Sequence, residues 1–240
     1  MRILITNDDS IKAAQLIPLV KWAQKLGEVT VYAPQEEQSG KSHSIEIHKP
    51  FSVNEMELLP DVRAYAVGSS PADCVRYAIL GRKEHFDLVI SGINRGYNLG
   101  TDIIYSGTIG AASEGAFLGV DAIAVSTDFL YYEHAVEHMD AIWDFFCRNR
   151  LLEKHSLYNV NIPPQGWDIR ITRQGGPYYS DDFAPGEDGL IHACGHCVYE
   201  PGTDLSVDTH CALNGHISIT PLSNILTEER LFTELRDTCK

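Results

Sequence analysis

Short apolar runs alternate with segments of helical spacing from the N-terminus to about Phe146. Residues 2–6 (RILIT) are apolar and β-branched, and residues 13–26 then carry apolar side chains at helical intervals before Gly27 closes the segment. The later members of the series are strands at 28–33, 87–91 and 122–126, helices at about 70–80 and 105–119, and a helix ending at Phe146. This alternation predicts an α/β core whose mostly parallel sheet is covered by helices on both faces.

From about Leu157 the pattern changes to short strand-like runs separated by Gly, Pro and Asp. The runs are YNVNIP, DIRITRQ and HISITPL. Such runs predict hairpins and extended arms. We therefore expect a core over residues 1–156 and a C-terminal hairpin and arm region over residues 157–240 that packs on it within one domain. The best loop candidates are residues 35–55 and 175–210.

The composition narrows the class of protein and of partner. A formal net charge of −14 argues against a polymeric nucleic acid on the surface, because phosphate contacts need clustered Lys and Arg. A small phosphorylated substrate fits if a metal ion supplies positive charge. No apolar run approaches the roughly 18 residues of a membrane span, and no signal segment precedes the first strand. We therefore expect a cytoplasmic protein without a membrane partner, whose scattered cysteines are reduced thiols.

Two adjacent carboxylates, Asp8 and Asp9, follow the first predicted strand. Ligands of an open parallel sheet bind outside the carboxyl ends of its strands, so chemistry is expected there. Each carboxylate would raise the pKa of the other unless a cation lay beside them, and the pair therefore indicates a metal. In the structural alternative, Asp8 caps the next helix and Asp9 is solvated. The ends of the other strands decide between the two.

Polar side chains also follow the second and third predicted strands. The loop APQEEQSGKSHS places the Ser39 hydroxyl beside a flexible glycine, and SGINRGYNLGTD offers the amides of Asn94 and Asn98. A ligand set of Asp8, Asp9, Ser39 and Asn94 would bind a cation through oxygen alone. Such a set favours Mg²⁺, Mn²⁺ or Ca²⁺ over zinc. The metal would orient a substrate and acidify a bound water.

The segment YSGT at 105–108 opens a predicted helix. Backbone N–H groups at a helix N-terminus, together with the hydroxyls of Ser106 and Thr108, form an anion site. A phosphate loop of the GxxxxGK[ST] form is absent, and helix starts are often rich in Ser, Gly and Thr for structural reasons alone. Beside the carboxylates and the Asn-containing loop, the segment favours phosphate binding.

Seven blocks along the chain occur in the order of one known family. The blocks are NDD at 7–9, the SG of EQSGKSHS, SGINRGYNLGTD at 91–102, YSGTIGAASEG at 105–115, NVNIP at 159–163, TRQG at 172–175 and GTD…ISITPL within 202–222. Together they resemble the SurE family, the stationary-phase survival nucleotidases. The match runs along most of the chain, and its extent makes a chance match implausible.

The resemblance implies a Rossmann-like core and a metal-dependent 5'(3')-nucleotidase that hydrolyses nucleoside monophosphates, with short polyphosphate as a further substrate. It implies one divalent metal ion per subunit, Mg²⁺ or Mn²⁺ foremost and Ca²⁺ as a further candidate in crystals. The implied metal ligands are Asp8, Asp9, Ser39 and Asn94, and the implied phosphate-binding residues are Asn98, Ser106, Gly107 and Thr108. It also implies a C-terminal region that pairs or exchanges between subunits, which would give a homodimer or homotetramer.

Two of the segments that depart from the family pattern bear on the metal site and on thiol chemistry. Ser10 stands where the family has Gly, and a serine would alter this turn beside the metal if the turn needs a positive φ. The segment Cys194-Gly195-His196-Cys197 has CxxC spacing, yet it lies far from any strand-to-helix start that would lower a thiol pKa. We expect a loop there, with metal binding and redox chemistry as alternatives.

The expected mechanism is in-line attack of a metal-activated water on phosphorus, while the metal and the helix start at 106–108 stabilise charge on the phosphoryl oxygens. Direct attack by Asp8 or Asp9 is an alternative. His43 is a candidate general acid or base because its loop also carries Ser39, although a lone loop histidine is more often solvated. The catalytic candidates are thus Asp8, Asp9 and His43.

Two rival functions use the same type of fold. One is a non-catalytic nucleotide or phosphate sensor, which would bind in the same crevice without turnover. The other is a Rossmann oxidoreductase, but no GxGxxG follows the first strand. The sequence therefore favours the hydrolase.

Overall fold

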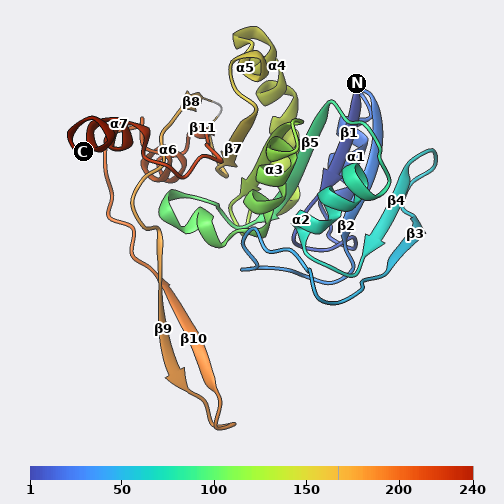
Figure 1. Cartoon of the computed structure of the whole chain (residues 1–240), viewed down its shortest axis with the longest axis horizontal. Coiled ribbons are helices and arrows are strands. Elements are labelled where there is room, and N and C mark those ends of the chain that lie inside the picture. The colour runs from blue at the N-terminus through green and yellow to red at the C-terminus, as the bar shows by residue number, and fades with distance from the viewer. Residues whose placement is uncertain (167, 240) are drawn as a thin grey trace.

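The computed structural model describes residues 1–166 and 168–239, and a nine-stranded sheet forms its centre (Figure 1). The strands in spatial order are β3 (Val53–Glu57), β4 (Arg63–Val67), β2 (Glu28–Pro34), β1 (Arg2–Thr6), β5 (Leu88–Arg95), β6 (Asp121–Thr127), β7 (Leu157–Ile162), β11 (Ile217–Pro221) and β8 (Ile169–Ile171). All strands from β4 across to β7 are parallel, whereas β3 and β11 run antiparallel to β4 and β7. The predicted mostly parallel α/β sheet is confirmed.

Helices cover both faces of this sheet, because the strand side chains alternate between two apolar clusters. Ile3 and Ile5 of β1 belong to the cluster that includes side chains of α1 (Leu16–Ala23) and α4 (Met139–Asn149). Leu4, between them, belongs to the cluster with side chains of α2 (Pro71–Arg76) and α3 (Gly107–Phe117). The other helical segments are the π-helix Tyr77–Gly81, the 3₁₀ helices η2 (Gly100–Tyr105) and η3 (Tyr132–His138), and α5 (Leu151–Lys154), α6 (Asp208–Leu213) and α7 (Glu229–Thr238).

The strand order reverses direction between β1 and β5. From β1 the chain moves outwards to β2 and β4 on one side, and from β5 it moves to β6 and β7 on the other. Loops that leave the carboxyl ends of β1 and β5 therefore diverge and leave a crevice, which is where open α/β sheets bind ligands. The candidate residues Asp8 and Asn94 lie at these two strand ends.

The C-terminal third both completes the sheet and extends away from it. Strands β7, β11 and β8 continue the central sheet across the expected division at residues 156 and 157. The predicted C-terminal hairpin is confirmed, since β9 (Tyr179–Pro185) and β10 (Ile191–Cys197) pair as an antiparallel hairpin. The interpretation of residues 175–210 as loop was wrong, because this hairpin lies within them. Both strands are exposed on both faces, so no apolar alternation marks them in the sequence. Residues 35–55 are largely loop, although β3 begins at Val53.

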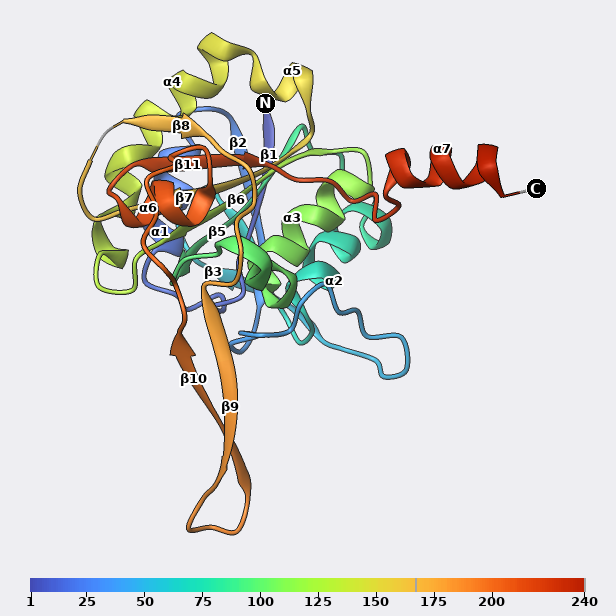
Figure 2. The ribbon, with the colours of Figure 1, turned by 90° about the vertical axis from the view of Figure 1, so that its left-hand side faces the viewer.

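Figures 1 and 2 show the β9–β10 hairpin and helix α7 projecting from the body in different directions. Helix α7 has no buried residue, and its apolar side chains Leu231, Phe232 and Leu235 are each about half exposed. In the part of the chain that the structure describes, no helix has both the length and the apolar character that a membrane crossing requires.

Candidate functional site

The carboxylates of Asp8 and Asp9 are held by two different elements. Thr108 at the start of α3 donates to Asp8 twice, from its hydroxyl at 2.5 Å and from its backbone N–H at 3.1 Å. The backbone N–H of Arg95, at the end of β5, donates to Asp9 Oδ2 at 3.2 Å. Asp8 is almost fully buried and Asp9 partly buried. Helix α3 and strand β5 thus fix the direction of both side chains.

Neither carboxylate has a positive partner among the ion pairs of the described residues. Burial raises the pKa of Asp8, and the hydrogen bonds from Thr108 only partly oppose this effect. Burial and the neighbouring Asp8 raise the pKa of Asp9 to about 6. The nearby Glu37 raises both pKa values further. Such a buried pair is stabilised by a bound cation, so these residues fit a divalent metal.

Ser39 and Asn94 line the same cavity as Asp8. The Ser39 hydroxyl donates to Glu37 Oε1 at 2.8 Å, so its lone pairs remain available to a cation. The Asn94 amide donates from Nδ2 to Gly96 O at 2.9 Å, which leaves its Oδ1 available as well. Within the described ranges there is no group of three or more His, Cys, Asp or Glu suited to a metal. A site here would therefore depend on these neutral oxygens in addition to the carboxylates.

A bulge in β5 delivers Asn94 to this position. The pairing register with β6 shifts between Ser91 and Asn94. Gly92 lies at the bulge with φ of +139°, and a Cβ on it would come within 2.3 Å of Val125 O. Only glycine fits that backbone beside its neighbour strand. The glycine of the SGIN block therefore has a steric role in placing the next polar residue.

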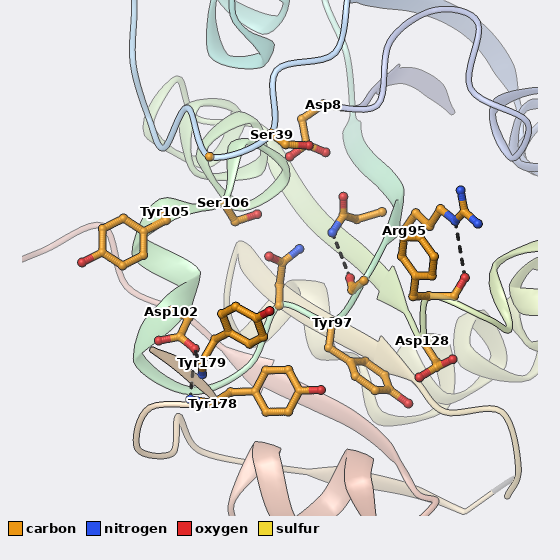
Figure 3. Close-up of a pocket in the computed structure, with 15 residues that line it drawn as sticks. Asp8, Ser39, Arg95, Tyr97, Asp102, Tyr105, Ser106, Asp128, Tyr178 and Tyr179 are labelled. Carbon is orange, nitrogen blue, oxygen red and sulfur yellow. Dashed lines mark hydrogen bonds between the residues drawn. The ribbon is translucent and has the colours of Figure 1, made fainter. Parts of the chain in front are cut away.

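The cavity at the carboxyl ends of β1 and β5 has a volume of about 350 Å³ (Figure 3). Of the residues expected from the sequence, five line it: Asp8, Ser39, Asn94, Asn98 and Ser106. Asp9 adjoins it through its bond to Arg95, which also lines the cavity. The structure therefore brings most of the expected metal and phosphate residues to one place.

At the start of α3, one residue lines the cavity and the next two contact the Asp8 side chain. The Ser106 hydroxyl caps the helix by accepting from Ile109 N at 3.2 Å, and Ser106 lines the cavity. Gly107 packs against Asp8, since a Cβ there would lie 3.0 Å from Asp8 Cβ. The backbone N–H and the hydroxyl of Thr108 both donate to Asp8. Gly107 and Thr108 thus lie against the carboxylate, and their contact with a phosphate stays a prediction.

Asn98 is fixed by a network of buried amides. Its Nδ2 donates to Ser126 Oγ at 2.7 Å, and its backbone N–H donates to Asn161 Oδ1 at 2.9 Å. Its carbonyl oxygen accepts from the side chains of Asn159 and Asn161, both at 2.8 Å. These two asparagines belong to the NVNIP block on β7. That block therefore acts by holding the Asn98 loop over the sheet.

His43 lies apart from the carboxylate pair. It lines a neighbouring cavity of about 790 Å³, and Ser106 is common to both cavities. Its Nε2 lies 2.7 Å from Glu114 Oε2, while Arg76 donates to the other oxygen of Glu114 at 2.9 Å. Helix α3 thus anchors the loop that carries both Ser39 and His43. The structure does not place His43 beside Asp8 and Asp9.

The two unusual segments take definite conformations. Ser10 has φ of +85°, so the turn after Asp9 requires the left-handed region that a glycine would adopt freely. The expectation of a loop at Cys194–Cys197 was wrong, since these residues lie in β10. Residues three apart in a strand point to opposite faces, so Cys194 and Cys197 do not converge on one another. Both are exposed free thiols.

Several residues that line the cavity at the carboxyl ends of β1 and β5 were not identified from the sequence. The aromatic members are Tyr97, Tyr105, Phe129, Tyr178 and Tyr179, and the acidic ones include Asp102 and Asp128. Tyr97 and Asp102 lie inside the SGINRGYNLGTD block, where their position after a strand was a usable signal. Tyr178 and Tyr179 carry no such signal, because the tertiary fold brings the root of the hairpin to the strand ends.

Comparisons with known proteins identify the family. A family model described as Survival protein SurE matches residues 3–181. The "5'-nucleotidase SurE" of Thermosipho melanesiensis is 35% identical over 99% of this chain and 97% of its own length, and that of Legionella pneumophila is 35% identical over 98% and 96%. The crystal structure of a SurE protein from Aquifex aeolicus superposes with a TM-score of 0.78 at 30% identity, covering all of both chains. The chain belongs to the SurE family.

Proposed function

We propose that this protein is a metal-dependent 5'(3')-nucleotidase that hydrolyses nucleoside monophosphates to nucleoside and phosphate, with short polyphosphate as a further substrate. The observation that carries the proposal is the buried, uncompensated pair Asp8 and Asp9 beside the α3 start in one cavity. The names of the relatives from Thermosipho melanesiensis and Legionella pneumophila support the same activity.

Four oxygen donors would hold one divalent metal ion per subunit, with Mg²⁺ or Mn²⁺ foremost and Ca²⁺ as a further candidate. They are Asp8, Asp9, Ser39 and Asn94. When bound, the ion supplies a Lewis acid and a water of lowered pKa for attack on phosphorus. Thr108 keeps the Asp8 carboxylate oriented through two hydrogen bonds.

The phosphate would lie at the start of α3. Ser106 lines the cavity there, and the positive end of the helix dipole favours an anion, while the N–H groups of Thr108 and Ile109 bond to Asp8 and Ser106. The Asn98 side chain lines the same wall and is held by β6 and β7 through Ser126 and Asn161. Because these donors are fixed before the substrate arrives, they cost little reorganisation when charge develops on the phosphoryl oxygens.

We retain His43 as a proposed general acid or base, acting only if its ring leaves Glu114. The support is its place in the Ser39 loop and the shared wall at Ser106. A pH–rate profile of His43→Ala tests this role. An acid limb identical to that of the wild type would dismiss it.

The central experiment uses the full chain stripped with EDTA and then supplied with Mg²⁺ or Mn²⁺. A nucleoside monophosphate should be hydrolysed only with metal, and Asp9→Asn should lose at least about 100-fold in kcat/KM, as expected when a ligand of the reacting centre is removed. The alternative function, a non-catalytic sensor, predicts that the protein binds the nucleotide but releases no phosphate with either metal ion.

We also propose a homodimer or homotetramer formed through the C-terminal region, in a cytoplasmic protein. The support is the unburied apolar side of α7 and the fully exposed hairpin. Apolar surface of this kind marks contacts between chains. Light scattering during size-exclusion chromatography of the full chain tests the proposal, and a mass of one subunit would contradict it.

A further inference from the structure

One positively charged side chain, that of Arg95, lines the cavity at the carboxyl ends of β1 and β5 in the described part of the chain. The carboxyl groups of Asp8, Asp102 and Asp128 line the same cavity, and the charge of Glu37 reaches Asp8 from nearby. A phosphate monoester is itself an anion, so these groups repel it when they are ionised. A cation on the cavity wall would offset that repulsion where the substrate binds.

The Arg95 guanidinium lies over aromatic rings and not against a carboxylate. Its Cζ lies 3.9 Å from the centroid of the Phe129 ring and 5.8 Å from that of Tyr132. Arg95 takes part in none of the ion pairs of the described residues. Burial and the neighbouring Asp8 raise the pKa of Asp9, and the charge of Arg95 opposes this increase less than the bond from its own backbone does. The positive charge is therefore not neutralised by a direct partner.

The contacts that hold this guanidinium are weak. Arg95 and Phe129 are both exposed, and a cation–π contact between exposed groups contributes little to stability. The bond from Arg95 Nε to Phe129 O is long, at 3.4 Å. By contrast, a guanidinium binds a phosphate through two parallel, charge-assisted hydrogen bonds, which are among the strongest in proteins. We therefore expect the side chain to exchange the Phe129 ring for two phosphate oxygens when a substrate is present.

The backbone of Arg95 is fixed beside the metal-site carboxylates while its side chain is exposed. Its N–H donates to Asp9 Oδ2 at 3.2 Å, and the residue pairs with Thr127 at the end of the β5–β6 ladder. In Figure 3, Arg95 and Ser106 lie on opposite sides of the cavity. A phosphoryl group between them would face the positive end of α3 on one side and the guanidinium on the other.

We propose that Arg95 is a catalytic residue, whose guanidinium leaves Phe129 and binds the phosphoryl oxygens of the substrate. The inference rests on the proposed nucleotidase function and adds a residue to its machinery. In phosphoryl transfer, negative charge is spread over the equatorial oxygens of the transferred group, and an arginine that contacts them stabilises the transition state. Lysine keeps the charge but lacks the planar pair of donors.

The test compares three variants for hydrolysis of adenosine 5'-monophosphate by the metal-loaded enzyme. Arg95→Ala should lower kcat by at least about 100-fold, with a smaller rise in KM, and Arg95→Lys should recover only part of the loss. Added guanidinium ion should restore part of the activity of Arg95→Ala, which a purely structural role would not allow. Arg148→Ala is the matched control, because Arg148 also donates from Nε to a backbone carbonyl, at 3.3 Å, is exposed and does not line the cavity. An unchanged kcat in Arg95→Ala would overturn the proposal.

Binding of inorganic phosphate separates this inference from the proposed function. Calorimetric titration of the Mg²⁺-loaded protein should show phosphate binding that weakens about tenfold in Arg95→Ala and is unchanged in Arg148→Ala. If no phosphomonoester is hydrolysed but phosphate binding depends on Arg95, the nucleotidase proposal fails and the contact with phosphate stands. If the wild type hydrolyses the nucleotide and Arg95→Ala matches it in both kcat and phosphate affinity, the assignment of Arg95 fails alone.

Discussion

At the scale of single residues, the site is defined by two carboxylates that form no ion pair within the described part of the chain. Asp8 is buried against Thr108, and Asp9 is partly buried beside it. Both pKa values are raised because burial disfavours the ionised form, and the charge of Asp8 raises the pKa of Asp9 further. The folded state of the metal-free protein is therefore destabilised at this pair, and a bound cation would remove that destabilisation.

The raised pKa of Asp9 predicts that the stability of the metal-free protein, kept in EDTA, depends on pH. The folded-state pKa of Asp9 is about 6, against 3.8 for an ordinary Asp, so the proton is bound more tightly in the folded state. Its contribution to stability is fully present below pH 3.8 and is lost as the pH rises through 6. The unfolding free energy of wild type relative to Asp9→Asn should fall by about 2 kcal/mol between pH 4 and 7. Urea titrations at each pH measure it, and a constant difference would contradict it.

Ser10 gives a second prediction at this scale. A non-glycine residue with φ of +85° pays a conformational cost of about 1 kcal/mol, so Ser10→Gly should raise the unfolding free energy by up to that amount. The gain is reduced by loss of the Ser10 hydroxyl, which accepts from Lys12 N at 3.3 Å. Ser10→Ala isolates that loss, because alanine keeps the backbone cost. A glycine variant no more stable than the alanine variant would refute the explanation.

At the scale of elements, the Ser39 loop depends on α3 rather than on its own sequence. The buried Glu114 carboxylate binds both His43 and Arg76, and Ser42 N donates to Tyr105 O at 2.9 Å. Burial by itself would raise the pKa of Glu114, but the bonds from His43 and Arg76 bring it below its ordinary value. Glu114 therefore remains ionised and joins the loop to α2 and α3.

Glu114→Gln should lower the unfolding free energy by about 1–3 kcal/mol at neutral pH, since a buried charge-assisted pair of hydrogen bonds is weakened. The gap should begin to narrow as the pH falls below the ordinary glutamate pKa of 4.5, where the unfolded carboxylate binds a proton, and should close only when the pH has passed the lowered folded-state pKa. The control is Glu153→Gln, whose ion pair with Arg150 is exposed and should be worth less than about 1 kcal/mol. Equal effects of the two substitutions would contradict the role of Glu114.

At the scale of the whole molecule, the reversal of strand order between β1 and β5 opens the crevice, and later chain completes it. Asp208 on α6 accepts from Gly100 N at 3.0 Å and Gly175 N at 2.7 Å, which ties the approach to the hairpin to the η2 segment. The hairpin root then reaches the strand ends through Asp102. Parts of the chain far apart in sequence therefore share one cavity, while α7 stays outside it (Figure 2).

The exposed apolar side of α7 predicts a change in assembly. Replacing Leu231 and Phe232 together by Ser should lower the mass measured by light scattering while circular dichroism stays that of the wild type, because no α7 residue is buried within the subunit. Glu234→Gln on the same helix should leave the mass unchanged. Loss of the folded spectrum in the Ser variant would show instead that α7 stabilises its own subunit.

The sequence by itself determined most of the parallel core strands and the identity of the residues at their ends, but not β3 and β4. Apolar periodicity is local, so it located β1, β2, β5 and β6, and thereby placed Asp8 and Asn94 at carboxyl ends that share an edge. Only the tertiary structure decided which distant segments meet there. The hairpin at 179–197 has no buried face to leave a pattern, and the bond between His43 and Glu114 joins residues 71 positions apart. The positive φ of Ser10 likewise became visible only in the folded turn, since packing around the strand ends fixes a backbone conformation that serine does not itself prefer.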